Sequence, residues 1–145
     1  MKILGIIPAR GGSKGLPGKN LRMFAGLPLI AHSILFAKMC PVISRCIIST
    51  DSPQIADIAR QFGGEVPFMR PTELAEDTTP IWPVVRHALH AVEESDMCYA
   101  LVVLLDPTSP AREPADITEA LRRLKEAPSA DGIIGVSRPR FNPVW

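Results

Sequence analysis

The chain has 145 residues, a length that suits one domain over residues 1–145 with a core of its own. Its 46% hydrophobic and 21% charged residues are typical of a soluble globular protein, and a net charge of +1 excludes the broad basic field that attracts nucleic acid. No segment approaches the roughly 20 apolar residues of a membrane span and no signal peptide is recognised, so we expect a cytoplasmic protein with no membrane and no nucleic-acid partner. Three cysteines without a CxxC pair exclude a disulfide framework and a zinc finger.

The first stretch of the chain joins a buried strand to a basic loop. Apolar residues 3–7 end at Pro8, which fits a parallel strand covered on both faces. The loop that follows holds four glycines together with Arg10, Lys14 and Lys19. Its backbone N–H groups and cationic side chains suit phosphate oxygens. A mobile surface turn is the alternative, but open α/β sheets bind ligands where their strands end, which favours a polyanion site.

Two better-known phosphate loops are excluded by the spacing. A Walker A loop needs a glycine five residues before its Gly-Lys-Ser/Thr, whereas here Ser13 stands at that distance from Gly18 and Asn20 follows the lysine. The dinucleotide-binding fingerprint fails because Arg10 occupies the position of its first glycine. The loop is therefore of another kind.

The rest of the chain alternates between helices and strands. We expect, in chain order, a helix at 28–39, a strand at 46–49, a helix at 53–62, a short strand at 65–68, a helix from Pro80, a strand at 99–105, a helix at 114–125 and a strand at 132–136. Ser52 is a fitting N-cap with Pro53 at the first helical position. The most continuous apolar run, at 99–105, is the best candidate for the central strand. This order favours a parallel sheet with right-handed crossovers and helices on both faces.

Four segments of the sequence occur in the order of a known enzyme family. They are IPARGGSKGLPGKNLR at 7–22, ISTDS at 48–52, VPFMRP at 66–71 and LLDPTSPAR at 104–112. Together they resemble the acylneuraminate cytidylyltransferases, also called CMP-sialic acid synthetases. The resemblance implies a Rossmann-like nucleotidyltransferase fold, a three-layer α/β/α sandwich with a mostly parallel sheet. It also implies transfer of CMP from CTP to the anomeric hydroxyl of an acidic sugar, with Mg²⁺ and release of pyrophosphate.

The same resemblance implies roles for the first loop and for one later arginine. Arg10 and Lys19 would lie against the phosphates and supply the catalytic stabilisation of charge. The nucleotide-binding loop would be completed by Gly11, Gly12, Ser13, Lys14 and Asn20. Arg70 matches the arginine of the family's LRP segment and would sit near the cytosine. Without the resemblance, a surface arginine is the alternative.

Asp106 departs from the family pattern. Typical sialic acid enzymes have LLQPTSPLR where this chain has LLDPTSPAR, so a carboxylate replaces an amide that resembles a sugar-binding residue. An aspartate at a strand end beside a triphosphate is a natural Mg²⁺ ligand, and a carboxylate that only caps the next turn is the alternative. Thr108, Ser109 and Arg112 are expected to contact the hydroxyls and the carboxylate of the acceptor, since arginine matches a carboxylate in shape.

The chain is also shorter than members of that family. They continue well beyond the RPRFNPVW segment at 138–145, with a further metal-binding carboxylate and a dimerisation extension, so we expect a chain that lacks its C-terminal part. Our first expectation is a cytidylyltransferase for a nine-carbon acylneuraminate-like acid, with homodimerisation left open. Two alternatives remain. One is a nucleotidyltransferase for another base or for another sugar, such as an eight-carbon ulosonic acid, and the other is a CTP-binding module that is catalytically incomplete.

Overall fold

The computed structural model of the chain describes residues 1–93 and 98–136. They divide into two compact units, Met1–Arg112 and a second that begins at Glu113. The first unit holds every strand and three of the four α-helices of the described chain. None of these helices has the length and apolar composition of a segment that crosses a membrane.

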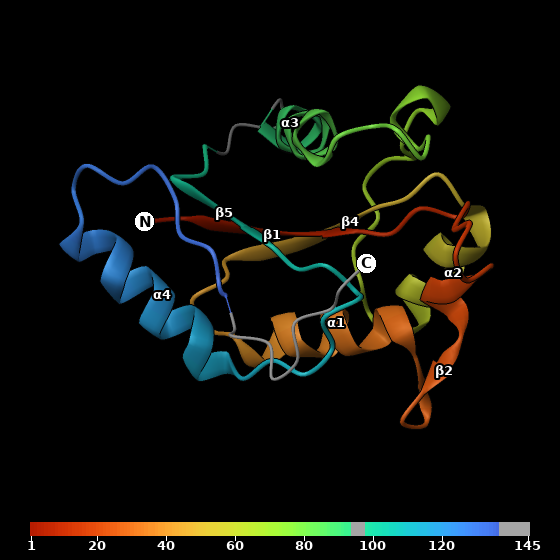
Figure 1. Cartoon of the computed structure of the whole chain (residues 1–145), viewed down its shortest axis with the longest axis horizontal. Helices are drawn as coiled ribbons and strands as arrows, with labels where there is room; N and C mark the ends of the chain where they lie inside the picture. Colours follow the sequence, from red (N-terminus) through yellow and green to blue (C-terminus); the bar gives the residue numbers. More distant parts are fainter. Residues whose placement is uncertain (94–97, 137–145) are drawn as a thin grey trace, which may run out of the picture. The chain divides into compact units, whose positions relative to one another are not determined.

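A three-stranded parallel sheet forms the middle of the first unit (Figure 1). Its strands are β1 (Ile3–Pro8), β4 (Arg45–Ser49) and β5 (Leu101–Leu104), in the order β4-β1-β5. The expectation that residues 99–105 form the central strand is wrong, because β1 pairs on both sides and β5 lies at an edge. Burial agrees with this order: Ile3–Ile7 are all buried, whereas the β5 side chains are half-buried or exposed.

Helices cover both faces of this sheet, as the alternating order predicts. They are α1 (Leu29–Met39), α2 (Pro53–Gln61) and α3 (Ile81–Glu93), and each begins within a residue or so of its expected start. Figure 1 shows α3 on one side of the sheet and α1 on the other. The predicted cap of α2 is present, since Ser52 Oγ accepts a hydrogen bond from Ile55 N at 3.4 Å. The unit is an α/β/α sandwich.

Short elements that the sequence did not predict follow the first loop and precede α3. They are the 3-10 turns η1 (Lys19–Leu21) and η2 (Thr72–Leu74), and an antiparallel pair of β2 (Met23–Phe24) and β3 (Leu27–Pro28). The two residues that join β2 to β3 both have positive φ, 46° at Ala25 and 85° at Gly26. Positive φ at both positions is the requirement of a tight hairpin turn.

The core is built where α3 packs on the sheet. Six fully or nearly buried apolar side chains form this cluster: Leu4, Ile6, Ile47, Val85, Ala88 and Val92. The apolar side of α3 is therefore core, except at the start of the helix, where Ile81 is 39% exposed. Because β1 is held in this core, the loop after Pro8 begins from a fixed point.

The second unit contains α4 (Pro114–Glu126), close to the predicted range. Two hydrogen bonds between Glu113 and Asp116 cap its start: Glu113 N donates to Asp116 Oδ2 at 3.0 Å, and Asp116 N donates to the Glu113 carbonyl at 2.9 Å. The strand expected at 132–136 is wrong, because these residues have no strand partner in the described chain and leave Ile134 and Val136 83% and 85% exposed. The segment 138–145 lies outside the described residues.

Candidate functional site

A cavity of about 320 Å³ opens at the carboxyl ends of the parallel strands. Side chains reach it from the loop after β1, from the segment between β4 and α3, and from the turn after β5. Seven of the predicted site residues line it: Arg10, Ser13, Lys19, Asn20, Arg70, Asp106 and Thr108. Five others do not: Gly11, Gly12, Lys14, Ser109 and Arg112. The sheet therefore brings together residues from three distant parts of the sequence.

The loop after β1 is anchored by two hydrogen bonds. Gly11 N donates to Asp51 Oδ1 at 2.9 Å, and the nearly buried Asn20 donates from Nδ2 to the Arg10 carbonyl at 3.0 Å. A Cβ atom on Gly11 would lie 3.0 Å from Ser52 Cβ, whereas one on Gly12 would meet nothing within 4 Å. The loop backbone at Gly11 is thus packed closely against the start of α2. The two hydrogen bonds hold the backbone next to Arg10 in place.

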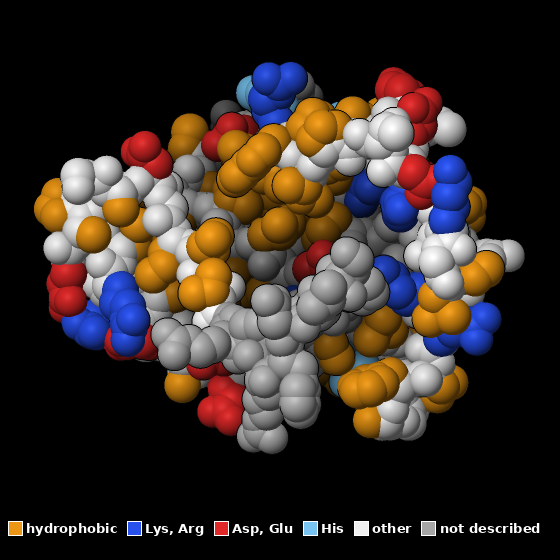
Figure 2. Space-filling view, viewed as in Figure 1, with side chains coloured by type: hydrophobic (Ala, Val, Ile, Leu, Met, Phe, Trp, Pro, Cys, Tyr) orange, Lys and Arg blue, Asp and Glu red, His pale blue; other side chains and the backbone are white. Residues whose placement is uncertain are grey.

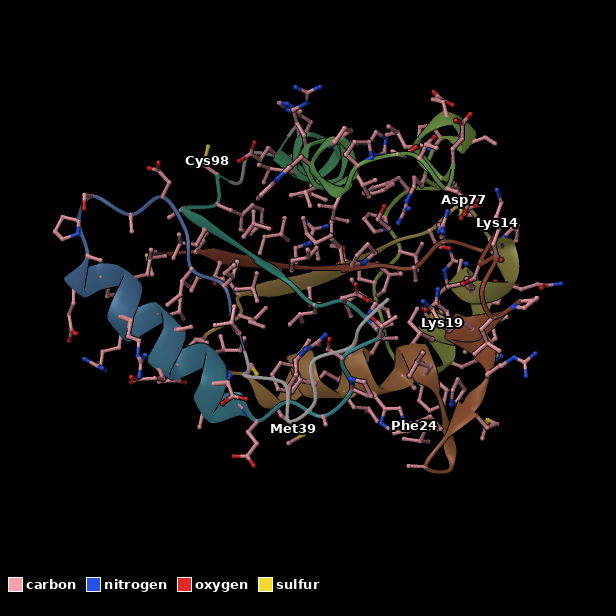
Figure 3. The ribbon with its side chains drawn as sticks, in the orientation of Figure 1. Lys14, Lys19, Phe24, Met39, Asp77 and Cys98 are labelled. Carbon is pink, nitrogen blue, oxygen red and sulfur yellow. The ribbon has the colours of Figure 1, made fainter. Side chains whose placement is uncertain are left out.

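Two cations of this loop share one carboxylate. Asp77, from the segment before α3, accepts from Arg10 NH1 through Oδ1 and from Lys14 Nζ through Oδ2, each at 2.6 Å. Figure 3 shows Lys14 and Asp77 next to each other, with Lys19 on the same side of the molecule. The Lys14 ammonium, and then Arg10, lower the pKa of the Asp77 carboxyl below its usual value. Asp77 is therefore an anion that neutralises part of the loop.

Lys19 is differently placed. It lines the cavity, and within the described residues no carboxylate lies at ion-pair distance from its ammonium group. Figure 2 shows Lys and Arg side chains beside Asp and Glu side chains at the right of the view, the end of the molecule that carries α2 in Figure 1. The charge at this end is mixed, and Lys19 is a cation left available to a ligand.

Arg70 is a buried cation at the end of β4, with only 6% of its surface exposed. Its Nε donates to Ser49 Oγ at 3.0 Å, its NH2 donates to the Ser49 carbonyl at 2.5 Å, and its backbone N donates to the Thr50 carbonyl at 2.7 Å. Burial lowers the pKa of the guanidinium, and the charge of Asp51 opposes that shift. The Ser49 carbonyl also accepts from Ala9 N at 2.9 Å. This single strand end positions both Arg70 and the start of the loop.

Asp106 lies in the turn after β5 and is exposed to solvent. Its Oδ1 accepts from Thr108 N at 2.9 Å and from Thr108 Oγ1 at 2.8 Å, while its carbonyl accepts from Ser109 N. The carboxylate therefore does cap its own turn. Because both bonds go to Oδ1, the geometry leaves Oδ2 for a cation in the cavity.

Arg112 is not among the residues that line the cavity. It donates from NH2 to the Asp106 carbonyl and from NH1 to Ser33 Oγ at 3.4 Å, and its guanidinium carbon lies 5.7 Å from the centre of the Phe36 ring. Burial lowers the pKa of the guanidinium, and the charge of Asp106 opposes that shift. In this arrangement Arg112 ties the turn after β5 to α1.

Sequence reasoning missed the residues that hold the cationic side chains and the loop of the site. Glu76 and Asp77 line the cavity, while Asp51 accepts a hydrogen bond from the loop and Ser49 accepts one from the buried arginine. A signal for the second pair was present, because both residues belong to the ISTDS segment, which directly follows a predicted strand. The polar segment 75–79 carried no comparable signal, since its position over the loop depends on the tertiary fold.

Comparison with known proteins gives one family and several relatives. Residues 4–138 match the family described as cytidylyltransferase. A CMP-N,N'-diacetyllegionaminic acid synthase from Legionella pneumophila is 43% identical over 145 residues, which cover 100% of this chain and 62% of that protein. An N-acylneuraminate cytidylyltransferase from Escherichia coli is 36% identical over 94% of this chain and 32% of its own length. A solved structure of CMP:2-keto-3-deoxy-manno-octonic acid synthetase in complex with CTP aligns with a TM-score of 0.75 and 26% identity, over 89% of this chain and 49% of the other.

Proposed function

The chain belongs to the cytidylyltransferase family, and on that premise we propose that it binds CTP in the cavity at the ends of β1, β4 and β5 and transfers CMP to an acidic sugar. The chain spans about 60% of the length of its Legionella relative, so the activity of the whole enzyme is part of the proposal. The observation that carries the proposal is the convergence of Arg10, Lys19 and Arg70 on one cavity. Three cations around a cavity of ligand size suit a polyanionic nucleotide.

The loop after β1 supplies the phosphate contacts in this proposal. Arg10 and Lys19 stabilise the charge that develops on the phosphates, while Ser13, Lys14 and Asn20 complete the loop. Gly11 and Gly12 keep the backbone close to the ligand without a side chain. Arg70 lies deeper, at the end of β4, where it is suited to contact the cytosine through those N–H groups that it does not donate to Ser49.

The donor set fits a divalent metal bound together with the nucleotide. The described residues hold no cluster of three or more His, Cys, Asp or Glu side chains, so the protein would supply few of the ligands. Mg²⁺ accepts such a site, because it prefers one or two carboxylates combined with phosphate oxygens and water. Asp106 would hold it through the oxygen that Thr108 leaves unused, and the ion would offset the negative charge of the triphosphate.

The reaction is an exchange at the α-phosphorus of CTP. The anomeric hydroxyl oxygen of the sugar forms the new bond to that phosphorus, the bond to the bridging oxygen of pyrophosphate breaks, and the hydroxyl proton is released. Alignment and charge stabilisation account for most of the acceleration in such transfers, and these are what the cations of the cavity provide. Thr108, Ser109 and Arg112 are the proposed acceptor contacts, of which only Thr108 lines the cavity.

The acceptor that we propose is an N-acylated nine-carbon sugar acid. The Legionella and Escherichia relatives carry the names of diacetyllegionaminic acid and N-acylneuraminate enzymes, and both support this class. The structural relative named for 2-keto-3-deoxy-manno-octonic acid keeps an eight-carbon acid as the second candidate. A cytoplasmic reaction and a homodimer complete the proposal.

Calorimetric titration tests the nucleotide part. We expect CTP with Mg²⁺ to bind more tightly than ATP, GTP or UTP, and the Arg10→Ala, Lys19→Ala double variant to lose this binding. The matched control is the Lys2→Ala, Arg86→Ala variant, which removes one lysine and one arginine from exposed positions outside the cavity lining. Equal binding of all four triphosphates, or equal loss in both double variants, would contradict the proposal.

Turnover is tested by the release of pyrophosphate from CTP with a panel of sugar acids. Release with a nine-carbon acid but not with an eight-carbon one would support the proposed acceptor, and the reverse would assign the second candidate. Selective CTP binding without release on any acid would assign nucleotide binding alone to this chain.

A further inference from the structure

One carboxylate of the cavity is bound as a phosphate group would be. Asp77 directs one oxygen to Arg10 and the other to Lys14, so that it bridges two cations of the same loop. Both cations are among the residues to which the proposed function gives phosphate contacts. Figure 3 shows Asp77 and Lys14 side by side, although they come from segments far apart in the chain.

The neighbouring acidic residue behaves differently. Glu76 also lines the cavity, and it makes no ion pair with any described residue. Glu76 is held through its backbone, where its carbonyl accepts a hydrogen bond from Thr79 N at 3.2 Å. The bridging of two cations is therefore a property of Asp77 and not of every carboxylate at this rim.

We propose that Asp77 is an internal competitor for the phosphate-binding cations, which holds Arg10 and Lys14 in the free protein and is replaced by phosphate oxygens when a triphosphate binds. The inference rests on the proposed function, because it assumes that these two cations bind phosphate. Each oxygen of the carboxylate and each oxygen of a phosphate accepts the same charge-assisted hydrogen bonds, so the exchange keeps the donors paired throughout.

Exposure makes this exchange feasible. The side chains of Arg10 and Asp77 are 32% and 28% exposed, and that of Lys14 is 86% exposed. Ion pairs open to solvent contribute little stability, so a ligand with several charges can displace the carboxylate. An anion with a single phosphorus or sulfur atom has fewer charged oxygens with which to replace the carboxylate. Asp77 therefore favours the binding of a polyphosphate over that of inorganic phosphate.

Titration of inorganic tripolyphosphate into matched variants tests the inference. Asp77→Asn removes the competing charge and keeps the size of the side chain, whereas Glu76→Gln measures what the loss of one nearby charge does by itself. We expect Asp77→Asn to bind tripolyphosphate about threefold to tenfold more tightly than the unmodified protein, and clearly more tightly than Glu76→Gln. Asp77→Asn should also bind inorganic phosphate more tightly than the unmodified protein does.

A double-mutant cycle separates the competition from other effects. In an Arg10→Gln, Lys14→Gln background, Asp77→Asn should raise the affinity for tripolyphosphate no more than Glu76→Gln does, because Asp77 then holds neither cation back from the ligand. Three results would overturn the inference. They are equal gains in affinity for Asp77→Asn and Glu76→Gln, weaker binding of tripolyphosphate by Asp77→Asn than by the unmodified protein, and no binding of tripolyphosphate by the unmodified protein or by Asp77→Asn. Thermal unfolding of each variant, and Asp77→Ala as a second substitution, control for an unfolded protein.

The two proposals fail in distinguishable ways. If the protein binds tripolyphosphate but does not select CTP over the other triphosphates, the proposed function is refuted. The affinities of Asp77→Asn and Glu76→Gln for tripolyphosphate can still be compared in that case. If the protein selects CTP but Asp77→Asn and Glu76→Gln change the affinity for tripolyphosphate equally, only the role of Asp77 is refuted.

Discussion

Neighbouring glycines of the loop should respond oppositely to the same substitution. Gly11 N donates to Asp51 Oδ1 at 2.9 Å, and a Cβ atom on Gly11 would lie 3.0 Å from Ser52 Cβ. Ser52 cannot easily retreat, because it caps α2. A Cβ atom on Gly12 would meet nothing within 4 Å, and Gly12 does not have a positive φ. We therefore expect Gly11→Ala to displace the loop and Gly12→Ala to leave it in place.

The expected difference follows from the cost of overpacking. Forcing an extra carbon into a filled site costs about 1–3 kcal/mol, and each 1.4 kcal/mol is about tenfold in affinity. Gly11→Ala should thus bind CTP about 5-fold to 140-fold more weakly than Gly12→Ala. Both substitutions reduce the freedom of the unfolded chain alike, so that effect cancels between them.

Calorimetry with CTP and Mg²⁺ measures the affinities, and thermal unfolding measures the stability independently of any ligand. Ser52→Gly provides a rescue, since it removes the opposing Cβ atom and glycine at an N-cap costs only a few tenths of a kcal/mol. The Gly11→Ala, Ser52→Gly double variant should recover most of the lost affinity. Equal binding by the two alanine variants, or no recovery in the double variant, would refute the reasoning.

Three further predictions concern the buried parts of the first unit. Arg70→Lys should weaken CTP binding by more than about tenfold, because lysine cannot reproduce the two bonds that the guanidinium donates to Ser49. The affinity for tripolyphosphate should stay unchanged, and a calorimetric loss of affinity for both ligands would contradict this prediction. Leu4→Ala should lower the free energy of unfolding by about 2–5 kcal/mol in a denaturant titration, because Leu4 is fully buried in the main cluster; a smaller change would mean that the core closes around the gap. Burial raises the pKa of the Cys46 thiol to about 12, so at pH 8 a thiol reagent should label the exposed Cys98 first. Mass spectrometry identifies the labelled cysteine, and rapid labelling of Cys46 would show that β4 opens.

The layered fold could be predicted from local patterns. An apolar run closed by Pro8 identified β1, and helical spacing identified the helices, because both signals lie within a few neighbouring residues. The order of the strands could not be predicted in the same way. The apolar run at 99–105 indicated burial on both faces, but which strand takes the middle depends on how the crossovers return, and that place went to β1.

The site was predictable to the extent that its residues follow strands. Arg10, Lys19 and Asp106 each come after a strand, and the parallel sheet brings them to one cavity. Asp77 follows no strand, and its ion pairs join segments whose proximity is set only by the packing of α3. The hairpin of β2 and β3 was missed because strands of two residues carry no periodicity.

The carbonyl of Ser49 couples the position of the phosphate-binding loop to the position of Arg70. It accepts from Ala9 N, where the loop begins, and from the Arg70 guanidinium, where the base is expected to lie. A shift of either donor changes the geometry available to the other. Binding free energies of separate fragments, cytidine on one side and tripolyphosphate on the other, should therefore not add independently, and each fragment should tighten the binding of its counterpart.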